Sequence, residues 1–357
     1  MIKITCAAFA TTLGLISAAG AQGVTVGGIA DAGLRVVKNQ DRGSQTTLAS
    51  GGNSTSRLFV RGSEDLGNGL SAGFHLEHGL NLASGTAASS TQFWDRRSTV
   101  SLISQAAGEL RLGRDFVPSY VNWSRYDPFS YVGVGGANTL ISATPTGPIR
   151  STFGSAANTT VRSNSAVQWL LPAFVAGLEG GLMVVSNEGG TAATGQHDVR
   201  GARLGYGQGG WSISAALTRT ENDLTTAGAL DDKAVAGMVN LGPVRLSLAV
   251  RQFSQGSADE NHLLVGAWLP VGQGEVKASV HRVKFSGNVG ATVLDANRAT
   301  QMSLGYVHNL SKRTALYTTA SRIDNRGALT FAVPGGISGL AAGKSSTGYE
   351  LGMRHNF

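Results

Sequence analysis

The sequence predicts an all-β protein, a 16-stranded antiparallel transmembrane β-barrel with one long external loop folded into its pore. Charged residues are only 14% of the chain, against roughly 25% in soluble domains, and glycine accounts for 50 of 357 residues. Apolar and polar residues alternate in many short runs, as they do in strands that face lipid on one side. The connections between these runs alternate between short and long, which is typical of barrels that cross a membrane.

The N-terminus has the features of a secretory signal peptide. Lys3 supplies a positive charge, residues 4–16 form an apolar core, and Ala19-Gly20-Ala21 is a small-x-small cleavage site. We expect cleavage after Ala21, which divides the chain into a signal peptide (1–21) and a barrel domain (22–357). A membrane anchor is the alternative, but the apolar core is shorter than the roughly 20 residues that span a bilayer.

Three alternating runs open the barrel domain. Val24–Val36 has one valine-rich and one polar face, and a loop rich in Gly, Ser and Thr separates it from Arg57–Gly62. Leu70–Leu80 follows after a tight turn. Arg57 and Glu77 lie on the polar faces of these runs, which point into the lumen if the sheet closes.

A hairpin and a long irregular segment come next. Ser98–Ile103 and Glu109–Arg114 are joined by a turn of small residues, which indicates a β-hairpin. From Asp115 to about Asn158 the chain has few alternating runs and many Pro, Gly, Ser and aromatic residues. A compact domain rarely carries so long a connection without a function, so we expect this segment to fold into the pore and narrow it.

The rest of the chain returns to alternation and supplies eleven more predicted strands, which brings the total to 16. An even number places both ends of the domain on one side of the membrane. The predicted strands are Arg162–Leu171, Ala176–Ser186, Val199–Tyr206, Trp211–Thr220, Ala234–Leu241, Val244–Gln252, His262–Leu269, Glu275–Phe285, Thr300–Asn309, Thr314–Ile323 and Gly348–Phe357. The sheet must close on itself, because exposed backbone polar groups are too costly in lipid.

The last strand is the sharpest of these runs. Tyr349, Leu351, Met353 and Phe357 alternate with polar residues or glycine, and the chain ends on an aromatic side chain. Chain ends normally fray into polar residues, so this pattern favours a closing strand. We expect these four residues to form the C-terminal signal that the barrel-assembly machinery reads.

Metal binding and catalysis find little support. His75 and Glu77 share a face but His78 lies opposite, so only two ligands converge where a metal site needs three or four. No G-x-S-x-G elbow or other activating motif accompanies the serines. The only cysteine, Cys6, leaves with the signal. The net charge of +7 is spread without a basic run, which does not point to nucleic acid.

Four segments resemble the general porins of Gram-negative β-proteobacteria, most closely the anion-selective porins of the Comamonas and Delftia group. They are TSRLFVRGSEDLGNGLSAGFHLE (Thr55–Glu77), RRSTVSL…GELRLGRDFVP (Arg96–Pro118), LGYVHNLSKRTALY (Leu304–Tyr317) and LGMRHNF (Leu351–Phe357). The resemblance runs over the whole chain. It implies a trimer of 16-stranded barrels, each with its third external loop folded into the channel, and that loop would begin after Arg114.

The resemblance also implies an arginine cluster at the constriction. It assigns Arg57 in S-T-S-R-L, Arg96 in R-R-S-T-V and Arg162 in V-R-S-N-S. Strand parity supports Arg57 but favours Arg97 over Arg96, because Arg97 shares a face with the polar Thr99 and Ser101; Arg97 is therefore kept as the alternative. Glu77 and Asp115 are candidate counter-charges. A basic ladder of Arg111, Arg245, Arg251 and Lys277 along the lumen is a further possibility.

The function that the resemblance implies is a general diffusion porin of the outer membrane for small hydrophilic solutes and ions, with a preference for anions. It implies no catalysis and no cofactor. The expected partners are two further copies of the chain, outer-membrane lipids with lipopolysaccharide, the barrel-assembly machinery and small anions, without nucleic acid. The alternatives are a substrate-specific outer-membrane channel and, from another class, an outer-membrane barrel hydrolase.

Overall fold

The structure is a computed structural model that describes residues 23–141, 160–173, 176–188, 196–222 and 228–357. The predicted signal peptide (1–21) lies outside these residues. No helix in the described ranges is long and apolar enough to cross a membrane.

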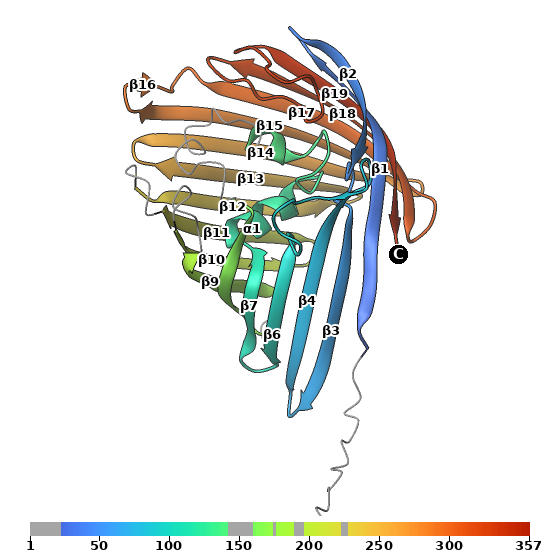
Figure 1. The fold of residues 1–357 in the computed structure, drawn as a ribbon, viewed down its shortest axis with the longest axis vertical. Helices are drawn as coiled ribbons and strands as arrows, with labels where there is room; N and C mark the ends of the chain where they lie inside the picture. The colour runs from blue at the N-terminus through green and yellow to red at the C-terminus, as the bar shows by residue number, and fades with distance from the viewer. Residues whose placement is uncertain (1–22, 142–159, 174–175, 189–195, 223–227) are drawn as a thin grey trace, which may run out of the picture.

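Sixteen antiparallel strands form a single closed sheet, which confirms the predicted fold class (Figure 1). Closure is made by β1, which pairs with β19 along Ile29–Asn39 and with β3 along Thr25–Ile29. The barrel strands are β1 (Thr25–Asn39), β3 (Arg57–Gly67), β4 (Leu70–Asn81), β6 (Arg97–Ser104), β7 (Gly108–Phe116), β8 (Arg162–Leu170), β9 (Leu178–Glu188), β10 (His197–Gln208), β11 (Trp211–Asn222), β12 (Leu230–Leu241), β13 (Val244–Gln255), β14 (Ala258–Val271), β15 (Gly274–Val289), β17 (Arg298–Asn309), β18 (Thr314–Arg326) and β19 (Ser345–Asn356). Each corresponds to one predicted run.

Three further strands lie among the connections: β2 (Gly43–Ser50), β5 (Thr86–Ala87) and β16 (Thr292–Val293). The sequence did not predict β2, since its residues fall in the loop rich in Gly, Ser and Thr. In the structure, these residues fold back and pair with the C-terminal half of β1, with Leu48 opposite Leu34. The prediction failed because only one side chain of β2 is strongly apolar, so the strand lacks the alternation that marks the others.

The alternation of residue types is an alternation of faces. On β13 the side chains of Leu248 and Val250 are exposed outward, while Ser247 and Ala249 are buried inside. The last strand shows the same pattern, with Leu351 63% exposed and Glu350 2% exposed. A barrel in lipid requires this arrangement, because its backbone hydrogen bonds are satisfied between strands and its apolar side chains face the acyl chains.

The segment after β7 turns inward, as predicted. It contains α1 (Pro118–Tyr126) and the short 3₁₀ helix η1 (Ala137–Leu140). Pro118 suits the first turn of α1, where no backbone N–H is needed. In Figure 1, α1 lies inside the barrel against β11 and β12, and it also contacts β9, β10 and β13.

Hydrogen bonds fasten this inward loop to distant parts of the wall. The Ser119 hydroxyl donates to Thr218 Oγ1 at 2.9 Å on β11, and Thr139 Oγ1 donates to Gln301 at 2.6 Å on β17. The Val134 N–H donates to the carboxylate of Glu350 on β19 at 3.2 Å. The loop therefore crosses the lumen from β11 to β19. Its second part, residues 142–159, lies outside the described residues.

Candidate functional site

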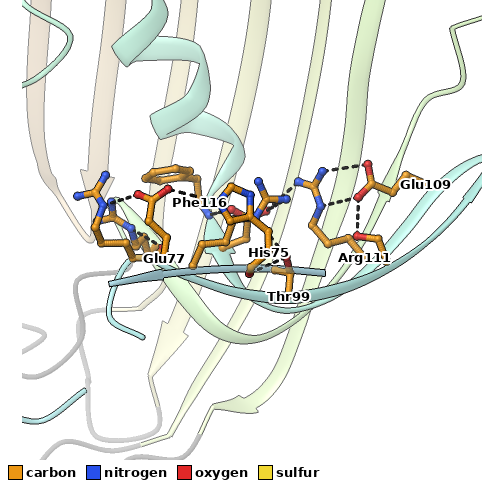
Figure 2. Close-up of polar contacts among 11 residues, drawn as sticks. His75, Glu77, Thr99, Glu109, Arg111 and Phe116 are labelled. Carbon is orange, nitrogen blue, oxygen red and sulfur yellow. Dashed lines mark hydrogen bonds and ion pairs between the residues drawn. The ribbon is translucent and has the colours of Figure 1, made fainter. Parts of the chain in front are cut away.

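A row of charged side chains lines the inner wall of β3, β4, β6, β7 and β8. Figure 2 shows it running from Glu77 past His75 to Arg111 and Glu109. We call it the constriction cluster, and it contains five arginines and three carboxylates: Arg57, Arg96, Arg97, Arg111, Arg162, Glu77, Glu109 and Asp115.

Glu77 holds one end of the constriction cluster. The Arg96 Nε donates a short hydrogen bond to Glu77 Oε1, and Arg57 Nε lies 3.7 Å from the same oxygen. His75 Nε2 lies 3.6 Å from the other carboxylate oxygen. The side chain of Arg57 is 24% exposed against 10% for Arg96, so Arg57 is the more accessible of the two cations.

Asp115 and Glu109 hold the other end. Arg111 binds both, with Nη1 2.8 Å from Asp115 Oδ2 and Nε 2.8 Å from Glu109 Oε1. Arg97 Nη2 lies 3.5 Å from Asp115 Oδ2. Ser101 completes this end by donating to Glu109 at 2.6 Å. These side chains converge because β6 and β7 are paired and every second residue faces the lumen.

Arg162 joins the row to the inward loop. Its Nε donates to the backbone oxygen of Arg96 at 2.9 Å, and its guanidinium lies 4.4 Å from the centre of the Phe116 ring. Phe116 in turn stacks on Tyr120 of α1 at 4.8 Å between ring centres. Burial raises the pKa of Tyr120 more than Arg162 and Arg96 lower it, so this phenol is neutral and supplies no counter-charge.

The structure brings together every charged residue that the sequence assigned to the constriction. Arg96 and Arg97 are both members of the constriction cluster. Arg97 is the first residue of β6 and follows the alternation of faces along the strand, whereas Arg96 lies before the strand, so this alternation does not determine where its side chain points. Arg97 Nε donates to the inward-facing Thr99 at 3.2 Å. The two arginines thus pair with different carboxylates at opposite ends of the row.

Two residues of the site were missed from the sequence: Glu109, a member of the constriction cluster, and Phe116, an aromatic side chain that lies against Arg162. Glu109 lies two residues before Arg111 on the same face of β7, and this spacing is the signal that could have identified the pair. Phe116 could be found only from the fold, because its role depends on Arg162 of the next strand.

The predicted basic ladder does not form a continuous row. Arg251 is fully buried and forms a two-pronged pair with Asp232, at 2.7 and 2.6 Å, beneath Trp123 of α1. Arg245 pairs with Glu275 at 3.4 Å and lies over Trp268. Of the four predicted residues, only Arg111 belongs to the constriction cluster.

Among the described residues, no group of three or more His, Cys, Asp or Glu side chains is arranged to hold a metal ion. His78 lies on the face opposite Glu77, with its ring stacked on Phe93 at 4.4 Å.

Comparisons with known proteins agree with the barrel fold. The family model described as Gram-negative porin matches residues 5–328. Outer membrane porin protein 32 of Delftia acidovorans is 35% identical, over 97% of this chain and 98% of that protein. The solved anion-selective porin from Comamonas acidovorans is 33% identical, with a TM-score of 0.79 over 94% of this chain and 99% of that one.

A more distant structure, the trimer form of OmpT from Vibrio cholerae, is 12% identical with a TM-score of 0.64. It covers 94% of this chain and 100% of that one, and it supports the fold alone. The chain therefore belongs to the Gram-negative porins, a family of channels rather than enzymes, and forms a general diffusion channel in the outer membrane.

Proposed function

We propose that this porin passes small hydrophilic solutes and ions with a preference for anions, and that the constriction cluster is its filter. The observation that carries the proposal is the imbalance of five arginines and three carboxylates in one row beneath the inward loop. The similarity to an anion-selective porin supports it.

Arginine suits such a filter for two reasons. Its charge is permanent, and its guanidinium is weakly hydrated, so it exchanges partners readily. Rings of charged side chains select ions through their field, and conduction requires that each ion also leaves. The three carboxylates fit this requirement, since they neutralise part of the cluster and prevent tight binding of any single anion.

The inward loop strengthens the filter. It narrows the lumen beside Arg162 through the stack of Phe116 on Tyr120. Salt screens charges poorly where little water is present, so the field of the cluster acts most strongly on ions at this point.

The working unit that we propose is a homotrimer that reaches the outer membrane after cleavage behind Ala21. Outer-membrane lipids, including lipopolysaccharide, surround it, and the barrel-assembly machinery recognises its last strand. The outward exposure of Tyr349, Leu351, Met353 and Phe357 supports this role for the last strand. The homotrimer is the assembly that the sequence resemblance to Gram-negative porins implies.

The test is the reversal potential of a single reconstituted channel in a tenfold gradient of potassium chloride. We expect the sign that corresponds to chloride permeation. A potential near zero or of the opposite sign would refute the anion preference while leaving the porin assignment intact. Saturating block by one solute, with others ineffective, would identify a substrate-specific channel instead.

A further inference from the structure

Strand β1 changes its partner at the point where the filter residue Arg57 enters the barrel. Its N-terminal part pairs with β3 as far as Ile29, which lies opposite Arg57. Its C-terminal part pairs with β2 from Ala32, which lies opposite Ser50. The turn 51–56 joins β2 to β3 here, and Arg57 is the first residue after it. The turn lies outside the sheet, so its backbone N–H groups need other acceptors.

Asp31 of β1 supplies these acceptors. Its fully buried carboxylate accepts hydrogen bonds from the N–H groups of Gly52, Asn53 and Ser54 at 3.1, 3.0 and 2.7 Å. Its backbone oxygen accepts from the Gly51 N–H at 2.9 Å. Successive N–H groups around one carboxylate form an anion-binding nest, and charge-assisted hydrogen bonds are roughly twice as strong as neutral ones. The charge of Asp31 therefore holds the turn in one shape.

Ser56 connects Asp31 to the start of β3. Its hydroxyl oxygen accepts from the Asp31 N–H at 3.1 Å and its hydroxyl group donates to the Asp31 backbone oxygen at 2.9 Å. The backbone oxygen of Ser56 accepts from the Leu80 N–H on β4 at 2.9 Å. Because Arg57 follows directly, Asp31 and Ser56 together fix the backbone from which the Arg57 side chain projects.

Tyr317 of β18 completes the surroundings of Asp31. Its hydroxyl donates to Asp31 Oδ1 at 2.7 Å, although β19 lies between β18 and β1. Glycines leave room for the ring to cross, since a Cβ at Gly352 would lie 2.3 Å from the Tyr317 hydroxyl oxygen and one at Gly33 would lie 3.0 Å from it. Asp31 forms no ion pair with a residue that the structure describes. Neutralising it would therefore release no cation into the lumen.

The ion pair of Arg57 does not fix its guanidinium. Arg57 Nε lies 3.7 Å from Glu77 Oε1, which is beyond hydrogen-bond range, and Arg96 donates the short hydrogen bond to that oxygen. The place of the Arg57 charge therefore depends on the backbone at the start of β3. We infer that Asp31 is a positioning residue of the anion filter, which holds Arg57 at the narrowing through the turn 51–56. This inference rests on the proposed filter.

The sign of the change in selectivity separates positioning from a direct effect of charge. D31N keeps the size of the side chain but removes a negative charge, so its field alone would raise the anion preference or leave it unchanged. If Asp31 positions Arg57, the chloride-over-potassium permeability ratio should fall instead. R57S should lower this ratio roughly threefold at 0.1 M salt, and D31N should lower it about twofold, because Arg57 then spends part of its time away from the narrowing.

The test is the reversal potential of single reconstituted channels of the wild type, D31N, R57S and D31N/R57S in a potassium chloride gradient. The ratio in D31N/R57S should equal that in R57S, since Asp31 acts through Arg57. E275Q is the matched control, because Glu275 also faces the lumen but pairs with Arg245. Its ratio should equal or exceed that of the wild type.

A D31N ratio at or above the wild-type value, with the expected fall in R57S, would overturn the role of Asp31 and leave the filter standing. A ratio in D31N/R57S well below that of R57S would show a general loosening of the pore and also overturn that role. An unchanged ratio in R57S would refute Arg57 as part of the filter, and the role of Asp31 with it.

Ser56→Ala decides the question if D31N does not assemble. It removes the hydroxyl that connects Asp31 to the residue before Arg57, without a change of charge, and should also lower the ratio. Ser303→Ala is its control, because it removes a buried serine hydroxyl on β17. Equal ratios in S56A, S303A and the wild type would overturn the inference.

Discussion

Replacing Arg57 and Arg162 together with serine should abolish most of the anion preference. The double variant leaves three arginines with three carboxylates: Arg96 on Glu77, and Arg97 and Arg111 on Asp115 and Glu109. The constriction cluster then has no net charge, so its field on passing ions should be small.

The magnitude follows from Coulomb's law. A unit charge roughly 7 Å from a chloride ion in water contributes about 0.6 kcal/mol, and a Debye length of about 10 Å at 0.1 M salt reduces this to about 0.3 kcal/mol. Two arginines therefore attract an anion by about 0.6 kcal/mol and repel a cation by the same amount. The chloride-over-potassium permeability ratio should fall roughly 8-fold in R57S/R162S at 0.1 M salt.

The assay is the reversal potential of single reconstituted channels in a potassium chloride gradient, repeated near 0.01 M salt. The Debye length there is about 30 Å, so the difference between wild type and variant should grow. Conductance should stay equal or rise, because two large side chains become small.

A matched control removes two arginines from the outer wall. Arg219 and Arg322 are about half exposed and pair with carboxylates there, so R219S/R322S should keep the wild-type potential. An unchanged potential in R57S/R162S, or an equal change in the control, would refute the assignment of the filter. A collapse in conductance would show that Arg162 mainly holds the inward loop through Arg96 and Phe116.

Three further outcomes are expected. Leu351→Arg should impair insertion, because a charge on the lipid face costs about 2–4 kcal/mol near the midplane; normal heat-modifiable migration on gels would show that this face does not contact lipid. Folded protein should run as an SDS-resistant trimer that dissociates on boiling, and a monomer by light scattering in mild detergent would contradict the assembly state. Trp123→Ala, which removes a fully buried side chain of α1, should cost about 3–5 kcal/mol and increase current noise as the inward loop loosens. The exposed Trp211→Ala is its control, and equal noise in both variants would contradict an anchoring role for Trp123.

The strands and their faces could be predicted from the sequence because they depend on local alternation. A strand in lipid presents apolar residues at alternate positions along its membrane-spanning part. The outward face of a strand can therefore be assigned from its own residues, as for Leu248 and Val250 on β13 or Tyr349 and Leu351 on β19. The same parity placed Arg57 and Glu77 inside. The same rule failed for β2, whose residues are mostly polar. It also makes no prediction for Arg96, which lies one residue before β6 begins.

Only the tertiary structure decided which charges pair and which remain accessible. Parity shows that a side chain points into the lumen, but it does not show what covers it there. Arg251 and Arg57 both face inward, yet Arg251 is sealed against Asp232 beneath α1 while Arg57 stays partly exposed beside Glu77. That difference comes from the path of the inward loop. Two of the contacts that fix this path are the hydrogen bond of Ser119 to β11 and the hydrogen bond of Val134 to β19. Those contacts join residues about one hundred to two hundred positions apart, a range at which local pattern carries no information because closure of the barrel alone brings them together.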